Sequence, residues 1–176
     1  AGVILCARVT IALVSTADEA YNKLASIAMA VVVSHYIHRK WLLNSQKNIS
    51  IKNLNQILEL AEGLVKKNGP YTVALAAGDD IVCVGGLELA KNRGLIKPIL
   101  VGHRRRIDEV FEKLNLSQNG WDIEADKDPK SATRNCAEMI LRGDADILMR
   151  GRLMARDFLK VLLEPGQNLR NPESLW

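Results

Sequence analysis

The sequence predicts an α/β fold of three layers, αβα, in which helices cover both faces of a mostly parallel β-sheet. Short apolar runs alternate along the chain with helical segments of roughly 10–15 residues, which is the spacing of right-handed crossovers between parallel strands. Hydrophobic residues make up 48% of the 176 residues and charged residues 25%, as in ordinary globular proteins. A chain of this length can bury one sizeable core.

The first part of the chain predicts one strand and one long helix. Residues 9–14 are apolar and mostly β-branched, which is typical of a buried strand. Residues 15–18 form a turn that can cap the next helix. That helix is expected from Asp18 to about His38, because apolar residues recur there at intervals of three and four. Polar residues 44–50 follow as a connector.

The rest of the chain predicts further strands that alternate with helices. Most of the strands are short apolar runs, one (residues 121–124) alternates between apolar and polar residues, and each helix has an apolar face bounded by glycine, proline, asparagine or aspartate. The strands are expected at residues 71–77, 98–101, 121–124 and 145–149, and the helices at residues 54–68, 81–92, 105–114, 128–141 and 157–163. The last ten residues, 167–176, have no clear period and are expected to be loosely attached.

Composition and charge exclude several classes of function. The net charge of +4 suits an anionic small molecule without demanding nucleic acid, and 5% aromatic residues are too few for a base-stacking platform. The three cysteines, Cys6, Cys83 and Cys136, form no close pair, which argues against a disulfide framework or a zinc site and favours a cytoplasmic location. No apolar run approaches the roughly 20 residues that span a membrane, so no membrane partner is expected.

Each of two polar clusters can be interpreted either as a metal site or as an ordinary part of a helix end. His35 and His38 are spaced so that they could share a metal ion, but no cysteine or acidic third ligand is near, and a polar helix end is favoured. Gly78, Asp79 and Asp80 follow a strand and could hold a metal–phosphate complex. A helix cap with acidic residues in the first turn is the more economical interpretation. No metal site is therefore expected.

Long motifs in two segments resemble one known family. Within residues 52–163 the chain has KNLNQILELA, LIKPILVGHRRRID and ADILMRGRLMARDFLKVLL, which are similar to the amino-terminal half of the phosphate butyryltransferase/phosphate acetyltransferase family. Within residues 6–30 it has VTIALVSTADEAYNKLASIAMA, which is similar to the carboxyl-terminal end of that family. The motifs agree with the family in both spacing and residue type.

The resemblance implies that pieces of one enzyme occur in permuted order. Residues 1–46 resemble the family's carboxyl-terminal strand and helix, and residues 47–176 its amino-terminal half, with the junction at residues 44–50. Family members fold as two α/β domains of isocitrate-dehydrogenase-like architecture, and both chain ends build the first. The two segments are therefore expected to form that first domain together, without the second. The strand at residues 9–14 should then lie in the same sheet as those at residues 71–77 and 145–149.

The resemblance also implies an activity. The family transfers an acyl group between CoA and phosphate: acyl-CoA and phosphate give CoA and acyl phosphate, with acetyl or butyryl as the acyl group. CoA is thus expected as a substrate, and no covalently bound cofactor is implied. The other expected partners are phosphate, acyl phosphate and further copies of the chain in a homo-oligomer. Such chemistry needs a phosphate cradle, a group that takes the thiol proton and donors for the tetrahedral oxyanion.

The turn at residues 15–18 matches the family's Ser-Arg-Ala-Asp motif in part. The resemblance implies catalytic roles for Ser15 and Asp18, and Thr16 would lie at the phosphate or CoA site. Backbone N–H groups at a helix start favour an anion. Thr16 stands where the family has arginine, and it cannot replace the charge or the forked geometry of that side chain. The alternative is that Ser15 and Asp18 are helix caps.

The segment after the strand at residues 145–149 carries the other expected phosphate- or CoA-binding residues. Arg150 and Gly151 lie where open α/β sheets place ligands, and Gly151 would let the backbone approach a phosphate. Lys160 aligns with a basic family position that faces the cleft. The alternatives are a surface arginine beside a turn glycine, and a solvated lysine. The run from His103 to Arg106 could mark a CoA phosphate, although a solvated charged face is favoured.

Two other functions stay open. Thr16, and Ala155 at a position where the family has a hydroxyl residue, favour a non-catalytic α/β binding or assembly module derived from such an enzyme. A generic nucleotide-binding Rossmann-like domain is disfavoured, because no G-x-G-x-x-G follows any expected strand.

Overall fold

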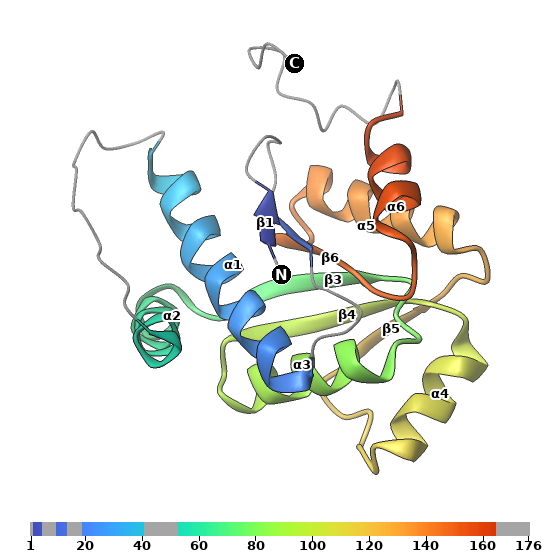
Figure 1. The fold of residues 1–176 in the computed structure, drawn as a ribbon, viewed down its shortest axis with the longest axis horizontal. Helices are drawn as coiled ribbons and strands as arrows, with labels where there is room; N and C mark the ends of the chain where they lie inside the picture. The colour runs from blue at the N-terminus through green and yellow to red at the C-terminus, as the bar shows by residue number, and fades with distance from the viewer. Residues whose placement is uncertain (1, 5–9, 14–18, 41–52, 165–176) are drawn as a thin grey trace.

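The protein is described by a computed structural model that covers residues 2–4, 10–13, 19–40 and 53–164 (Figure 1). Its strands form a single six-stranded sheet in the order β1-β2-β6-β3-β4-β5. The strands are β1 (Gly2–Ile4), β2 (Thr10–Leu13), β3 (Tyr71–Ala76), β4 (Ile96–Gly102), β5 (Asp122–Ala125) and β6 (Ile147–Arg150). The helices are α1 (Ala20–Lys40), α2 (Leu54–Asn68), α3 (Ile81–Asn92), α4 (Arg104–Lys113), α5 (Pro129–Arg142) and α6 (Ala155–Leu162).

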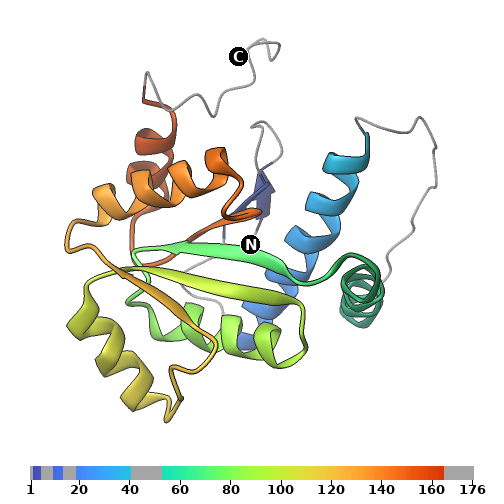
Figure 2. The same ribbon diagram turned by 180° about the vertical axis from the view of Figure 1, so that it is seen from behind.

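The sheet is mostly parallel and has helices on both faces, which confirms the predicted three-layer class. Strands β2, β6, β3, β4 and β5 run parallel, and β1 pairs antiparallel with β2 at the edge. Helices α1 to α4 pack on one face and α5 and α6 on the other, as the two views from opposite sides show (Figures 1 and 2). The antiparallel strand β1 was not expected from the sequence.

Alternate residues of the central strand β3 supply the two cores. Val73 and Leu75 belong to the core beneath α1 to α4, whereas Ala74 and Ala76 belong to the core beneath α5 and α6. All four are fully buried. Successive side chains of a strand point to opposite faces, so a strand covered on both sides is apolar without a break. This explains why β3 has no polar alternation in the sequence.

Strand β2 brings the start of the chain into the centre of the fold. It pairs in parallel with β6, with Ile11 opposite Leu148 and Ala12 opposite Met149, and β6 in turn pairs with β3. The strand expected at residues 9–14 therefore lies, in its described part, in the same sheet as β3 and β6. This prediction is confirmed. The turn at residues 15–18, the connector at 44–50 and the tail at 167–176 lie outside the described residues.

Strand β4 is longer than the expected residues 98–101 and extends on both sides of Pro98. The sequence places its start at that proline, but the strand begins at Ile96. Strand β5 pairs with β4 only from Ile99 onward. Pro98, which has no N–H to donate, thus lies where one side of β4 has no partner strand in the described sheet, and proline is tolerated there.

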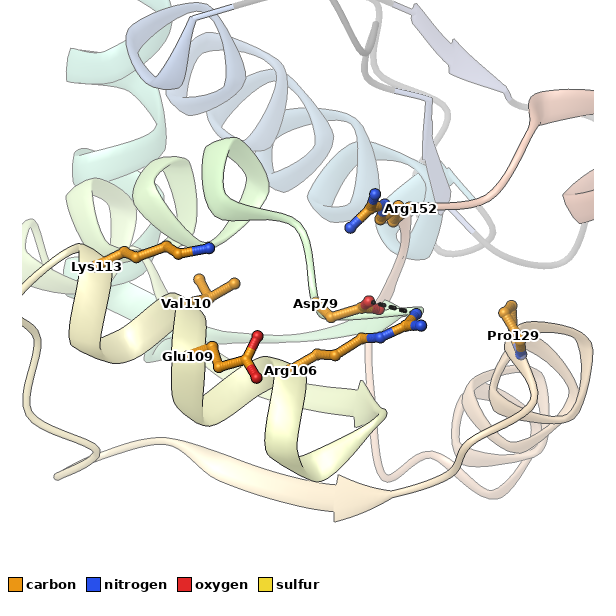
Figure 3. Close-up of a pocket in the computed structure, with 7 residues that line it drawn as sticks. All are labelled: Asp79, Arg106, Glu109, Val110, Lys113, Pro129 and Arg152. Carbon is orange, nitrogen blue, oxygen red and sulfur yellow. Dashed lines mark ion pairs between the residues drawn. The ribbon is translucent and has the colours of Figure 1, made fainter.

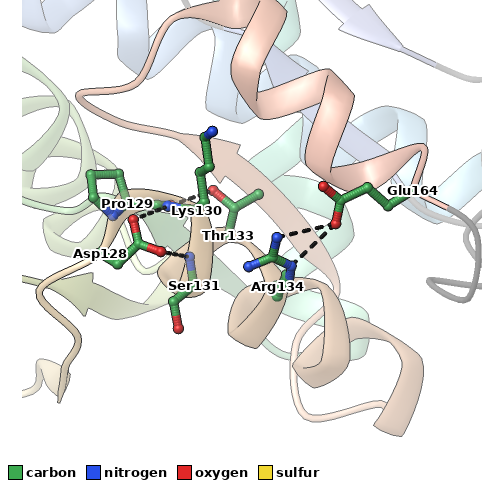
Figure 4. A network of polar contacts seen from close by, with 7 residues as sticks. All are labelled: Asp128, Pro129, Lys130, Ser131, Thr133, Arg134 and Glu164. Atoms are coloured by element: carbon green, nitrogen blue, oxygen red, sulfur yellow. Dashed lines mark hydrogen bonds and ion pairs between the residues drawn. The ribbon is translucent and has the colours of Figure 1, made fainter.

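Helix α5 is held by a side-chain cap at its start and by an ion pair from its first half, and the sequence signals these contacts in part. The Asp128 side chain accepts hydrogen bonds from the backbone N–H groups of Lys130 and Ser131, with Pro129 in the first turn (Figure 4). Carboxylate caps and first-turn proline both favour a helix start. The guanidinium of Arg134 donates two hydrogen bonds to Glu164, each 3.2 Å long, and so ties α5 to the end of α6 (Figure 4).

We expect Gly151→Ala to lower the free energy of unfolding by about 3 kcal/mol, because a β-carbon there would lie 2.7 Å from the Ala76 carbonyl oxygen and closer still to that of Ala77. Gly63 in α2 is the matched control. Nothing lies within 4 Å of the β-carbon position at Gly63, so Gly63→Ala should stabilise by about 0.5–1 kcal/mol. Urea unfolding measures both changes. Equal stability of the Gly151→Ala and unsubstituted proteins would contradict this account.

Candidate functional site

The carboxyl ends of the parallel strands meet at one edge of the sheet. From β3 the chain crosses to β4 and then β5 on one side, and it returns through α5 to β6 on the other side of β3. The direction of winding therefore changes between β3 and β6. Open α/β sheets bind ligands beyond the carboxyl ends of the strands at such a switch point. This edge is the candidate functional site.

The loops that follow β3 and β6 are in direct backbone contact at the switch point. The N–H of Gly151 donates to the carbonyl of Ala76 at 2.8 Å, and the N–H of Arg152 donates to that of Ala77 at 3.0 Å. Ala77 has a φ of 53°, in the left-handed region. Gly151 is thus required by the close approach of two backbones. Its contact with a phosphate stays a prediction.

Arg150 is buried at the end of β6, with 6% of its surface exposed. Its Nη1 donates to the carbonyl of Leu153, and its own carbonyl oxygen lies 3.8 Å from the Cys83 Sγ, which donates to it. The alternative of a surface arginine is therefore wrong. A buried guanidinium at a switch point suits an anion, because it is held in place by neighbouring backbone.

Lys160, another expected site residue, is not brought to Arg150. Lys160 lies exposed in the last turn of α6, whereas the start of that helix is next to the switch point, so the solvated-lysine interpretation fits its position. Ser15, Thr16 and Asp18 lie outside the described residues. Strand β2, which precedes them, has its carboxyl end at the same edge of the sheet as β6.

A buried lysine and cysteine lie between α1 and α3, and sequence analysis missed them. Lys23 is 1% exposed, and its Nζ donates to the Cys83 Sγ at 3.4 Å. Helix α3 can come this close because Gly86 faces Lys23, where a β-carbon would lie 2.7 Å from the lysine's own. The only signal in the sequence is that Lys23 adjoins the apolar residues of α1.

The thiols among the described residues are not poised for chemistry. Burial, followed by the negative charge of Asp80, raises the pKa of Cys83 to about 12. Burial also raises the pKa of Cys136. Because the thiolate is the nucleophile, thiols held protonated are inert at neutral pH. Cys83 therefore has a structural role at this edge.

The two metal alternatives receive no support. His35 is buried, and its Nδ1 lies 3.0 Å from the Tyr71 hydroxyl, so the expectation of a polar helix end is wrong for this residue. No group of three metal-ligating side chains occurs in residues 2–4, 10–13, 19–40 and 53–164. Asp80 caps α3 by accepting from Val82 and Cys83, which confirms the cap interpretation for that residue. Asp79 does not take part in the cap.

The arginines at the start of α4 point to two different places, the surface of the helix and a pocket. Arg104 pairs with Asp108 at 3.1 Å and Arg105 with Glu109 at 3.4 Å, both one helical turn away. Arg106 turns instead toward the loop after β3, where its Nη1 lies 3.5 Å from the carboxylate of Asp79 (Figure 3). The solvated-face interpretation thus fits the first two arginines, and a different one is needed for the third.

The pocket at Arg106 has a volume of about 320 Å³ and lies beside the switch point. Its lining comes from one face of α4, from the loops after β3 and β6, and from the first residue of α5. The lining residues are Asp79, Arg106, Glu109, Val110, Lys113, Pro129 and Arg152 (Figure 3). The spacing of the four α4 residues is helical, so the sequence did carry a signal for them. The burial of Asp79 was not visible in the sequence.

Among the described helices, none is both long enough and apolar enough to cross a membrane.

Comparisons with known proteins point to one enzyme family. No family model matches the chain. The chain is 30% identical over 119 residues to a phosphate butyryltransferase of Clostridium beijerinckii. This match covers 68% of this chain and 38% of the relative. It is 27% identical over 122 residues to a phosphate acetyltransferase of Thermotoga maritima, covering 69% of this chain and 40% of the relative. It is also 27% identical over 125 residues to a phosphate butyryltransferase of Clostridium acetobutylicum, a match that covers 71% of this chain and 40% of the relative.

The chain therefore spans about two-fifths of the length of the relatives it matches. Among solved structures, the signal recognition particle receptor FtsY of Elizabethkingia anophelis matches 72% of this chain and 49% of its own with a TM-score of 0.26 and 16% identity. That likeness is too weak to bear on fold or function. The similarity to phosphate butyryl- and acetyltransferases thus rests on sequence.

We expect the stability of the protein to fall as the pH rises above the ordinary thiol pKa of 9.0 toward the raised pKa of Cys83, about 12. In this window the unfolded chain loses the thiol proton and the native state keeps it, so stability that is fully present below pH 9 is lost. Cys83→Ala should make the fall shallower by about 1.4 kcal/mol per pH unit. Urea unfolding between about pH 9.5 and about pH 11 measures the slopes. Equal slopes would contradict a buried, protonated thiol; below pH 8 the two proteins serve as their own control.

Proposed function

We propose that the chain is a domain of a phosphate acyltransferase, which converts acyl-CoA and phosphate into CoA and acyl phosphate. The observation that carries the proposal is similarity, at 27–30% identity over about 70% of the chain, to proteins named phosphate butyryltransferase and phosphate acetyltransferase. The acyl group is then acetyl or butyryl. CoA is a substrate here, not a bound cofactor.

The reaction assigns a task to each expected site residue. In the direction from acyl phosphate to acyl-CoA, the CoA thiol gives up its proton, and the thiolate attacks the carbonyl of the acyl phosphate. The bond between the carbonyl carbon and the phosphate oxygen then breaks, so that phosphate leaves as the thioester forms. In our proposal Asp18 takes the thiol proton and Ser15 donates to a phosphoryl oxygen. The charge of Arg150 holds the phosphate, because guanidinium groups match its oxygens in pairs. Gly151 keeps the backbone beside it free of a side chain.

The proposal includes the order of the segments. Residues 1–46 and 47–176 would together make the first of the two domains of such an enzyme, in permuted order. The pairing of β2 with β6 supports it, because the early strand completes the sheet next to Arg150. We also propose a cytoplasmic location and self-association into a homo-oligomer. The buried free thiols of Cys83 and Cys136 fit a reducing compartment.

A non-catalytic binding or assembly module is the second candidate. Two departures favour it: Thr16 lacks the charge of an arginine, and Ala155, the first residue of α6, has no hydroxyl. Such a module would bind CoA or phosphate, or an assembly partner, without turnover.

Formation of thioester from CoA and acetyl or butyryl phosphate, followed by thioester absorbance, separates the two candidates. We expect weak but measurable turnover by the 176-residue chain. Loss of one donor to the reacting group costs about a hundredfold or more, so Ser15→Ala should abolish the signal. Thr16→Arg should strengthen the use of acyl phosphate by about tenfold, since it restores a charge-assisted contact.

Each variant has a matched control. Ser117→Ala removes an exposed hydroxyl from the connection between α4 and β5, at the opposite edge of the sheet, and should leave turnover unchanged. Thr16→Gln adds a long side chain without charge and should show no gain. Absence of thioester from the chain and from Thr16→Arg alike would reject the enzyme and favour the binding module.

A further inference from the structure

The turn between α4 and β5 contains Asn119-Gly120, one of two Asn-Gly pairs in the sequence; the other, Asn68-Gly69, ends α2. Asparagine before glycine is prone to deamidation, because glycine leaves the backbone nitrogen that attacks the asparagine side chain free of steric hindrance. Both asparagines are exposed to solvent. Exposure therefore does not separate the two pairs, whereas their hydrogen bonds do.

The reaction needs a backbone N–H that can lose its proton and a side-chain amide that can turn toward it. Hydroxide takes the proton of the nitrogen that follows asparagine, and this nitrogen attacks the side-chain carbonyl carbon. The C–N bond of the side-chain amide breaks, ammonia leaves after taking a proton from water, and a succinimide ring remains. Water then adds to either carbonyl carbon of the ring and opens it. The products are aspartate or isoaspartate, and the net change consumes water and releases ammonia.

Both reacting groups at Asn68 are engaged in the end of helix α2. The Nδ2 of Asn68 donates to the carbonyl of Leu64 at 2.7 Å, so the side chain is turned back along the helix. The N–H of Gly69 donates to the carbonyl of Val65 at 2.8 Å. Both hydrogen bonds must break before the nitrogen can attack, which makes the reaction slower.

Asn119 lacks both restraints. In the part of the chain that the structure describes, its side-chain amide makes no hydrogen bond, and neither does the N–H of Gly120. Gly120 has a φ of 75°, and beyond its chain neighbours nothing lies within 4 Å of its β-carbon position. The turn is closed around the pair by the N–H of Trp121, which donates to the carbonyl of Gln118 at 3.1 Å. The turn thus has room for a succinimide ring.

Lys91 places an ammonium group against the same peptide bond. Its Nζ donates to the carbonyl oxygen of Asn119 at 3.3 Å. That oxygen and the nitrogen of Gly120 belong to one peptide group, so the oxygen takes up part of the negative charge when the nitrogen loses its proton. A positive donor fixed on such an oxygen stabilises the charge as it develops.

Two further contacts hold Lys91 in this position. The carboxylate of Glu88 lies 2.9 Å from the Nζ, and the centre of the Trp121 ring lies 5.0 Å from it. The side chains of Lys91 and Glu88 are only 20% and 18% exposed, so solvent screens the ammonium less than it would at an open surface. The donor is therefore in place before the reaction begins.

We propose that Asn119 is a site of spontaneous deamidation to aspartate and isoaspartate, promoted by Lys91, and that Asn68 is protected. The proposal does not depend on acyl transfer, because this turn lies at the opposite edge of the sheet from Arg150. Isoaspartate adds a carbon atom to the main chain close to Trp121, a buried residue whose ring centroid lies 5.1 Å from that of Phe111. Its formation should therefore weaken the packing at the start of β5.

Incubation of the full chain for several days in neutral buffer, followed by peptide mass spectrometry, measures the rate at each asparagine. Each rate is divided by the rate of the same asparagine in the chain unfolded in urea, which removes the effect of the neighbouring sequence. We expect the normalised rate at Asn119 to exceed that at Asn68 by at least about tenfold, since Asn68 must break two hydrogen bonds. Equal normalised rates would overturn the proposal.

Lys91→Met tests the role of the ammonium group, because methionine keeps much of the side-chain shape without the charge. The variant, shown to be folded by its thermal transition, should deamidate at Asn119 about fivefold more slowly or less, the effect of losing one charged donor. Lys91→Arg keeps a charged donor and should retain most of the rate. Lys66→Met, at an exposed lysine of α2, is the matched control and should change nothing.

An unchanged rate at Asn119 in folded Lys91→Met would overturn the role of Lys91. The comparison of Asn119 with Asn68 uses the unsubstituted chain, so it decides the site even where Lys91→Met does not fold. The effect on packing has its own readout. Incubation should lower the temperature of the thermal transition in the unsubstituted chain but not in Asn119→Gln, whose side chain would have to close a larger ring. An equal fall in both would overturn the effect on packing.

Discussion

The backbone of Gly151 lies so close to the carbonyls of Ala76 and Ala77 that no side chain fits between the loops after β3 and β6. This contact holds the two loops together at the switch point of the sheet. It fixes the end of β6, where Arg150 is buried, and it directs Arg152, the residue after Gly151, toward the pocket beside α4. The placement of both Arg150 and Arg152 therefore depends on one pair of backbone hydrogen bonds.

A second contact supports the same edge from behind. Lys23 and Cys83 join the starts of α1 and α3, and the Cys83 thiol reaches the carbonyl of Arg150. A buried ammonium is costly unless it is hydrogen-bonded, and the Lys23 ammonium donates to the Cys83 Sγ. Through it the early segment of the chain is linked to β6 by side chains as well as by the pairing of β2.

The sequence predicted the sheet because its strands and helices carry strong local signals. Helix α3 was placed at its observed bounds, since it follows an aspartate cap and ends before a glycine with positive φ. Strand β1 was missed, because three residues carry no period. The candidate site was predicted less completely. The burial of Arg150 and Asp79, and the pocket between α4 and Arg152, depend on how distant loops meet, and no local pattern encodes that.

Hydrogen–deuterium exchange of the chain with and without CoA tests the central claim, that the ligand lies at the carboxyl edge of the sheet. Bound ligand slows exchange of backbone amides that it covers or orders. Our account predicts protection in the loops after β3 and β6, residues 77–80 and 151–154, and along the pocket face of α4, with none in the connection between α4 and β5 at the opposite edge. Protection at the opposite edge, or no change at residues 151–154 under saturating CoA, would contradict it.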